Sequence, residues 1–207
     1  MRPLATALVA TLLATVLVSA LAGCAVGGSV PEATPEAEDT CDLLSADEIV
    51  ALAGGDLGEP EPGEATGLPT CRWGSPDGIG VQVIDVPVAQ WAAQLDPVLD
   101  EIEQSELGAD SETATKLAEA RELLASDDID DAEGCELFGL FLEIQGLAPG
   151  QTRTVNVIPD VETPEAVAAQ SCGDGRFTSV LIQGGAVTGS EDEVARVDDA
   201  LDAVLAD

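Results

Sequence analysis

Carboxylates are the side chains in this chain that are most available for acid–base chemistry. The sequence has 207 residues with 40 Asp and Glu and no His, and Lys116 is its single Lys. The lack of His excludes Ser-His-Asp and Cys-His catalysis. The Ser-x-x-Lys pattern also fails, because Thr113 stands where that motif needs Ser. A glycoside hydrolase needs only two carboxylates. The sequence therefore leaves a carboxylate-dependent hydrolase as an enzymatic alternative and identifies no catalytic residue for it.

A second chemical signal is Cys24, which ends the tetrapeptide Leu21-Ala22-Gly23-Cys24 after an uncharged apolar run. Arg2 precedes that run. This order is typical of an export signal, and a cysteine at the cleavage point is typical of lipoproteins. We therefore predict a lipoprotein signal peptide over residues 1–23, with Cys24 lipidated. The alternative is an uncleaved anchor over residues 3–30, because about 20 apolar residues span a bilayer. Both place the remainder on the extracytoplasmic face of the cell membrane.

The other four cysteines are Cys41, Cys71, Cys135 and Cys172. An even number in an exported chain predicts two disulfides. There is no Cys-x-x-Cys pair, and these cysteines lack the short paired spacings of a zinc site. Four cysteines allow three connectivities. Of these we favour Cys41 with Cys71 and Cys135 with Cys172, because each disulfide then closes a loop within one half of the domain.

The charge of the chain restricts its partners. The formal net charge is −33, and loss of Arg2 with the signal peptide makes it −34. Such a charge repels nucleic acid and attracts cationic partners at low salt. The spread of the carboxylates favours a solvated surface on a monomer. The densest group, residues 127–133, lacks the spacing and central Gly of an EF-hand. We expect a solvated loop there, and no metal, cofactor or nucleic-acid partner.

Composition divides the mature chain into a tether and a domain. Residues 25–40 combine Gly, Pro, Ala, Glu and Thr with little apolar surface, and we assign residues 24–40 to the lipidated N-terminus and a flexible tether. Such a coil reaches roughly 20–24 Å. Residues 41–207 then form a single extracytoplasmic domain with a sizeable core. Aromatic side chains are scarce, and the five expected to anchor that core are Trp73, Trp91, Phe138, Phe141 and Phe177.

Helices are indicated at both ends of this domain. A capping box at Ser45 and Glu48 predicts a short helix that ends at Gly54. A second capping box, at Ser190 and Glu193, begins the clearest helix, which continues to the C-terminus. Residues 88–125 have a helical pattern with breaks near Pro97 and Gly108. Residues 133–144 fit either a helix or a buried strand, because their apolar run satisfies both patterns.

Strands are indicated at residues 71–73, 79–86, 152–158 and 177–183. A turn at residues 75–78 joins the first two as a hairpin. Residues 58–69 have the composition of a loop, and Thr163-Pro164-Glu165 is typical of a helix start. A capped helix, a cysteine and a turn-linked strand occur in each half. We therefore predict a pseudo-repeated α+β domain, with a mostly antiparallel sheet and helices packed on one face.

One segment also resembles a known family. Its residues are Cys41-Asp42-Leu43-Leu44, the capped helix that ends at Gly54, and Cys71-Arg72-Trp73 at the start of a strand. This pattern is similar to that of actinobacterial envelope lipoproteins that carry a domain of unknown function. The resemblance covers the signal peptide and about residues 41–86, and it implies an envelope lipoprotein without catalytic residues. The acidic stretch near residues 100–134 departs from the family pattern.

Two hypotheses follow for what the domain does. The first is a non-enzymatic binding or interaction module, lipid-anchored on the outer membrane face, that recognises an envelope protein or a small ligand. The second is a hydrolase of envelope glycans that uses a pair of carboxylates. Two carboxylates about 5 to 10 Å apart in a deep cleft would favour the hydrolase. An apolar groove would favour the binding module.

Overall fold

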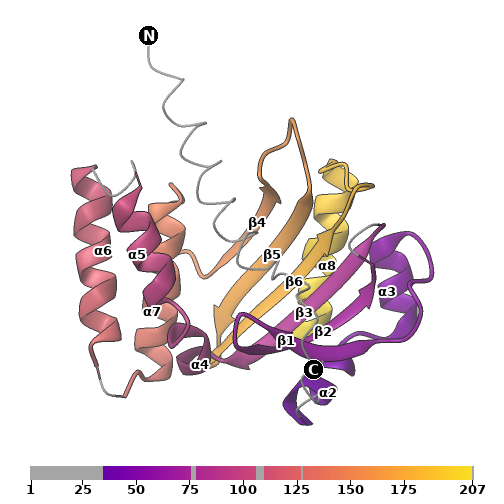
Figure 1. The fold of residues 1–207 in the computed structure, drawn as a ribbon, viewed down its shortest axis with the longest axis horizontal. Coiled ribbons are helices and arrows are strands. Elements are labelled where there is room, and N and C mark those ends of the chain that lie inside the picture. The colour runs from indigo at the N-terminus through magenta and orange to yellow at the C-terminus, as the bar shows by residue number, and fades with distance from the viewer. Residues whose placement is uncertain (1–34, 76–77, 106–109, 127, 207) are drawn as a thin grey trace.

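The computed structural model describes residues 35–75, 78–105, 110–126 and 128–206 (Figure 1). The predicted signal peptide and Cys24 lie outside these residues. Helices and strands alternate in groups along the described chain. In order they are α2 Pro35–Cys41, α3 Ala46–Ala53, β1 Glu61–Ala65, β2 Leu68–Gly74, β3 Gly80–Pro87, α4 Val88–Ala92, α5 Asp96–Gln104, α6 Ser111–Leu124, α7 Asp131–Ile144, β4 Arg153–Ile158, β5 Ala166–Gly173, β6 Arg176–Gln183 and α8 Glu191–Leu205.

The strands form one six-stranded sheet in the order β1-β2-β3-β6-β5-β4. Every neighbouring pair is antiparallel. The sheet is thus two three-stranded meanders, β1–β3 and β4–β6, joined where β3 pairs with β6. This confirms the predicted α+β class with its antiparallel sheet. It also gives the pseudo-repeat a concrete form, since each half of the chain contributes one meander.

One face of the sheet is covered by α3 and α8, and we call it the α8 face. Side chains alternate between the two faces of a strand, so Val81, Val83, Val180 and Ile182 all point to this side. They are buried with Leu52 of α3 and with α8 residues. The aliphatic core, as we name this cluster, consists chiefly of Val, Leu, Ile and Ala, with Trp73 as its single aromatic residue.

The opposite face is covered at one end by α4, α5, α6 and α7, which stand together beside the sheet in Figure 1. The strand residues Ile84, Val86 and Phe177 point to this side. Phe177 stacks on Trp91, with ring centroids 4.9 Å apart, and Phe138 meets Trp91 edge-on at 5.7 Å. We call this cluster the aromatic core. The predicted helical layer is that of α3 and α8, and the α4–α7 group adds helices on the other side.

All five aromatic side chains that were expected to anchor the core are buried, at 9% exposure or less. Four of them, Trp91, Phe138, Phe141 and Phe177, gather in the aromatic core. A further small group of buried strand residues lies on the same face as the aromatic core. It consists of Ile158, Ala166, Ala168 and Leu181.

Several predicted elements are confirmed. Ser45 and Glu48 form a complete capping box, and Gly54 ends α3 in a left-handed conformation. The hairpin of β2 and β3 is present. Residues 133–144, whose sequence fitted either a helix or a buried strand, lie in helix α7. The predicted break near Pro97 is present, because α4 ends at Ala92 and α5 begins at Asp96. Pro97 lies in the first turn of α5, as expected for a residue that has no N–H to donate. The predicted break near Gly108 falls outside the described residues.

Other predictions are wrong. The helix start at residues 163–165 is absent, and β5 begins directly afterwards at Ala166. The predicted loop over residues 58–69 contains β1. The tether prediction also fails for residues 35–40, because they lie in α2, where Ala37 and Thr40 are almost fully buried. Tertiary contact overrides weak local preference in each case. β5 pairs with β4 and β6, β1 pairs with β2, and α2 packs on β2.

Candidate functional site: cysteines and charged side chains

The four predicted disulfide cysteines pair as expected. Cys41 bonds to Cys71, with Cα atoms 5.0 Å apart, and Cys135 bonds to Cys172, with Cα atoms 5.4 Å apart. Each bond connects a helix to the middle strand of one meander, α2 to β2 and α7 to β5. Cys71 lies in the aliphatic core and Cys172 in the aromatic core. The two disulfides therefore secure opposite faces of the sheet.

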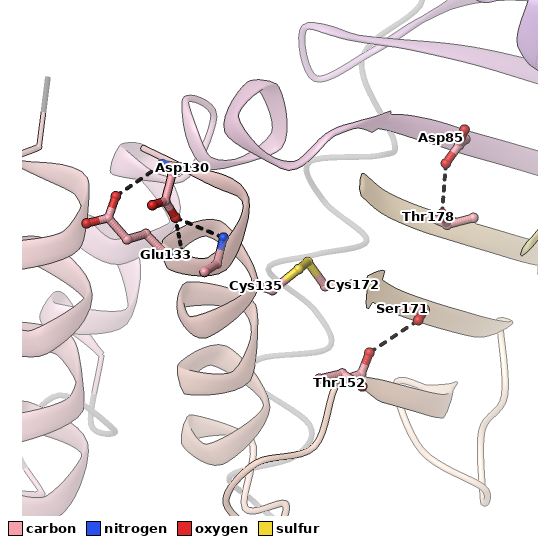
Figure 2. The surroundings of a disulfide bond; sticks show 9 residues. Asp85, Asp130, Glu133, Cys135, Thr152, Ser171, Cys172 and Thr178 are labelled. Carbon is pink, nitrogen blue, oxygen red and sulfur yellow. Dashed lines mark hydrogen bonds between the residues drawn. A yellow bond between two sulfur atoms is a disulfide. The ribbon is translucent and has the colours of Figure 1, made fainter. Parts of the chain in front are cut away.

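The second disulfide stands close to the N-terminus of α7 (Figure 2). Asp130 caps this helix, because its Oδ1 accepts hydrogen bonds from the N–H groups of Ala132 and Glu133, both at 2.9 Å. The Glu133 carboxylate accepts in return from the Asp130 N–H at 3.1 Å. Carboxylates are stabilised at this end of a helix by its dipole. The acidic group at residues 127–133 thus contains a helix start, which the Asp-x-x-Glu spacing signals.

The described residues contain no group of three or more His, Cys, Asp or Glu side chains arranged to hold a metal ion. Residue 127 of the acidic group lies outside them. Two of the carboxylates described there, Asp130 and Glu133, complete the capping box of α7. Their geometry is that of a helix cap rather than of a cation cage.

A row of polar side chains crosses the sheet on the α8 face. Asp85, Thr178, Ser171 and Arg153 are neighbours in register on β3, β6, β5 and β4. Asp85 accepts from Thr178 Oγ1 at 2.8 Å, as Figure 2 shows, and from Arg176 Nε at 2.8 Å. Ser171 Oγ donates to the carbonyl of Thr152 at 3.3 Å. No described buried side-chain N or O atom lacks a partner, so this polar row is satisfied within the fold.

Arg153 connects the polar row to α8. Its Nε donates to Asp198 Oδ1 at 3.0 Å, its Nη2 donates to the Asp198 carbonyl at 2.9 Å, and Asp202 is a further partner. Burial disfavours the charged guanidinium, but the hydrogen bonds to Asp202 and Asp198 outweigh that cost and raise the pKa of Arg153. The side chain therefore fixes β4 to α8 as a permanent cation.

The cationic side chains are almost all engaged in ion pairs. Of the six Lys and Arg side chains that the structure describes, five have a carboxylate oxygen within 4.0 Å. Lys116 pairs with Glu143 across α6 and α7, and Arg121 connects α6 to three carboxylates on α5. The Glu143 hydrogen bond raises the pKa of Lys116. Since these positive charges are compensated inside the fold, the surface presents mainly carboxylates to a partner.

Two carboxylates have pKa values that their hydrogen bonds lower. The Ser45 hydroxyl and the Ser45 backbone N–H hydrogen bond to Glu48 and lower its pKa. The backbone N–H of Thr163, followed by its hydroxyl, lowers the pKa of Asp160. A general acid in a glycoside hydrolase needs the opposite shift, toward a proton held near neutral pH. Both groups therefore act as ionised caps of local structure.

Comparison with known proteins adds no family to this description. No family model, no curated protein and no solved structure matches the chain. Among the described helices, none combines the length and the apolar character needed to cross a membrane. The predicted lipidation of Cys24 and the resemblance to envelope lipoproteins stay predictions.

Proposed function

We propose that this protein is a lipid-anchored binding module on the outer face of the cytoplasmic membrane. The observation that carries the proposal is the pairing of the cysteines. Cys41, Cys71, Cys135 and Cys172 are all consumed in two disulfides, so Cys24 is left over. Disulfides persist in exported proteins, and an unpaired cysteine that ends Leu21-Ala22-Gly23-Cys24 is suited to lipidation.

The way α2 is attached supports an anchor upstream of it. This helix is the first described element, and its last residue, Cys41, is bonded to β2. Ala37 and Thr40, one helical turn apart, are 0% and 3% exposed. A pull from the membrane side of Pro35 would therefore reach the sheet through a covalent bond.

A binding role also fits how the charged groups are used. The carboxylates with lowered pKa values cap local structure, and the five paired cations stabilise contacts between elements. The remaining acidic surface attracts basic partners over a range of about 10 Å at moderate salt. The proposed partner is accordingly a protein or ligand with positive charge that lies close to the membrane.

Substitution of Cys24 tests the anchor. In cells that process lipoproteins, the wild-type protein should fractionate with membranes, and the mass of its N-terminal peptide should show a diacylglyceryl group on Cys24. Cys24→Ala should abolish lipid labelling, whereas Ala25→Ser, one residue after Cys24, should leave it unchanged. A wild-type protein that keeps residues 1–23 and carries no lipid would instead establish the uncleaved anchor.

Crosslinking in cells tests the binding role. A photoreactive residue placed at exposed positions of the lipidated protein, such as Val50 and Val161, should capture a partner from one position and not from all. The captured protein should then bind the purified domain, and high salt should weaken that binding. Release of sugars from purified cell wall by the protein, with loss of release in a carboxylate variant, would contradict this role and establish the hydrolase.

A further inference from the structure

We infer that the outer edge of β4 is a docking site for an extended segment of another envelope protein, with basic side chains near that segment's N-terminal end. The inference rests on the proposed binding function and locates it. An unpaired strand edge presents backbone N–H and C=O groups that a further strand can pair with. The sheet has two such edges, at β1 and β4, and they differ.

The β1 edge carries the usual obstacles to further pairing. It is five residues long, Pro62 has no N–H to donate, and Glu61 and Glu64 place charges on it. Helix α2 also contacts β1. Short length, Pro and charge are devices that block addition of a strand. The β4 edge, with the sequence Arg-Thr-Val-Asn-Val-Ile, contains no Pro and no acidic residue.

The hydrogen-bond register shows which backbone groups of β4 point outward. The Cys172 N–H donates to the Thr152 carbonyl at 2.9 Å, so this opposed pair is of the hydrogen-bonded type. Such pairs alternate along an antiparallel ladder, which turns Thr154 and Asn156 toward β5 and leaves Arg153, Val155 and Val157 facing out. Among the described residues, no hydrogen bond is formed by the outward N–H and C=O groups of these three residues.

The β4 strand is also held rigidly enough to act as a template. The side chains of Val155 and Val157 pack against the aliphatic core. Arg153 is fixed to Asp198 and Asp202 of α8. Binding of a partner strand would therefore lose little conformational entropy in β4, which is the advantage of a preorganised site.

The segment that follows β4 indicates the chemistry of the partner. Val161 is 66% exposed, more than the other exposed large apolar side chains, Val50 and Leu205. Asp160 and Glu162 flank it, and the Asp160 carboxylate accepts from the N–H groups of Glu162 and Thr163, which fixes the turn. An antiparallel partner would bring its N-terminal end to this turn. Lys or Arg there would meet Glu162, and an apolar side chain would cover Val161.

Charge also selects between two occupants of the edge. A second copy of the chain would bring another formal charge of −33 against the first, and its own β4 would offer only Arg153 as a cation. Like charges of this size oppose association. The negative charge attracts a basic segment of a different protein and repels a second copy of the chain. We therefore assign the β4 edge to the basic segment.

The test uses the mature lipidated protein in detergent micelles and the amidated peptide Lys-Lys-Thr-Val-Thr-Val-Thr as the probe. Saturating peptide should slow amide hydrogen exchange at Val155 and Val157 by about tenfold or more. Val155→Pro removes one outward donor and should weaken peptide binding by about tenfold. Val155→Thr keeps the donor and should bind within about twofold of wild type. Unchanged exchange protection of β5 and β6 shows that each variant is folded.

A second pair of variants avoids any risk to the fold, because it changes exposed side chains only. Val161→Ser and Glu162→Gln should each weaken binding by about threefold, and the Glu162→Gln effect should shrink in high salt. Absence of binding near 1 mM peptide, or binding without protection of the two valine amides, overturns the edge site. Protection without peptide that grows with protein concentration identifies a second copy and overturns the basic partner. If crosslinking in cells yields a partner that Val155→Pro still binds, the edge fails while the binding function stands.

Discussion

The two cores of this domain differ in what fills them. The aliphatic core lies between the strands and α8, and Trp73 is its single aromatic residue. The aromatic core lies where α4–α7 meet one end of the sheet, and it holds the other four aromatic side chains. Parallel layers of helix and sheet are filled well by small branched residues, whereas a junction of four helices with a strand end leaves irregular space for rings. The scarce aromatic residues are thus placed where the packing geometry needs them.

The two cores nevertheless share one plan. Each contains a disulfide that joins a helix to the middle strand of a meander, Cys41–Cys71 on the α8 face and Cys135–Cys172 on the other. A two-fold axis normal to the sheet would relate the strand orders of the meanders but would keep both disulfides on one face. The repeat is therefore in the strand order, while the disulfide-bonded helices of the two halves lie on opposite faces.

The largest expected effect comes from removing a tryptophan from each core. Trp91→Ala should destabilise the domain by about 4–5 kcal/mol, because it opens a cavity and also removes three ring contacts. Trp73→Ala should cost about 3–4 kcal/mol, since no ring contact adds to its burial. Urea unfolding of both variants measures the difference. Equal losses would show that the ring contacts contribute nothing beyond buried area.

Removal of each disulfide compares the two halves directly. The sequence separations are 30 and 37 residues, for which the loop-entropy relation gives losses of about 3.7 and about 3.8 kcal/mol. The double variants Cys41→Ser/Cys71→Ser and Cys135→Ser/Cys172→Ser should therefore lower the free energy of unfolding almost equally. A difference above about 1.5 kcal/mol would mean that one half retains structure in the unfolded chain.

Two glycines of α7 sharpen the comparison on the aromatic side. A Cβ added at Gly134 would lie 2.5 Å from Val88 Cγ1, so Gly134→Ala should destabilise by about 1–3 kcal/mol. A Cβ at Gly139 would find its nearest neighbour, the Gln151 carbonyl oxygen, at 3.6 Å. Gly139→Ala should therefore stabilise the helix by up to about 1 kcal/mol. Thermal unfolding of the pair checks this, and a neutral Gly134→Ala would refute the close approach of α4 and α7.

These glycines also show where the sequence stops being informative. Glycine is unfavourable inside a helix, so Gly134 and Gly139 left residues 133–144 compatible with a strand. The reason for a glycine at position 134 is the close approach of Val88, which the sequence does not reveal. The capping box of Ser45 and Glu48 identified the start of α3 from local signals alone. The Thr163-Pro164-Glu165 pattern misled, because Pro164 precedes a central strand whose identity comes from pairing on both sides. Long-range pairing is not encoded in a short window.

In the candidate site, too, features with a local sequence signal were predicted and features that depend on strand pairing were not. An even count of four cysteines predicted two disulfides, and the sequential pairing was correct. The polar row at Asp85, Thr178, Ser171 and Arg153 was missed, because its members come from four strands and become neighbours only through the register. The open edge at β4 was missed for a related reason, since the strand order decides which strands lie at an edge.

The cap of α3, on the aliphatic side, gives a pH-dependent test. Ser45→Ala should cost about 1 kcal/mol, because it removes the oxygen that accepts from the Glu48 N–H. The folded pKa of Glu48 is lowered, so its contribution is present above the unfolded value of about 4.3 and is lost as the pH falls through the folded pKa. The difference between wild type and Ser45→Ala should therefore narrow in acid. A constant difference from neutral pH to about pH 3 would contradict this role of the Glu48 charge.

The smallest expected effects compare one surface arginine from each side. Arg121 meets Asp96, Asp100 and Glu103 on the aromatic side, and these carboxylates are largely exposed. Arg121→Met should cost about 0.5 kcal/mol at low salt. Arg153 on the α8 face also donates to the Asp198 carbonyl at 2.9 Å, so Arg153→Met should cost about 1 kcal/mol.

Salt distinguishes the stability loss of Arg121→Met from that of Arg153→Met, because it screens an exposed ion pair more than a half-buried hydrogen bond. Without Arg121, three carboxylates of α5 repel one another, and raising NaCl from about 20 mM to about 500 mM should recover most of the lost stability. The Arg153→Met deficit should recover only in part, because salt screens the lost ion pairs with Asp198 and Asp202 but does not replace the hydrogen bond to the Asp198 carbonyl. Urea midpoints at the two salt concentrations measure both responses. Equal recovery would mean that Arg153 holds β4 to α8 by charge alone, and β4 would then be a less rigid template for a partner strand at high salt.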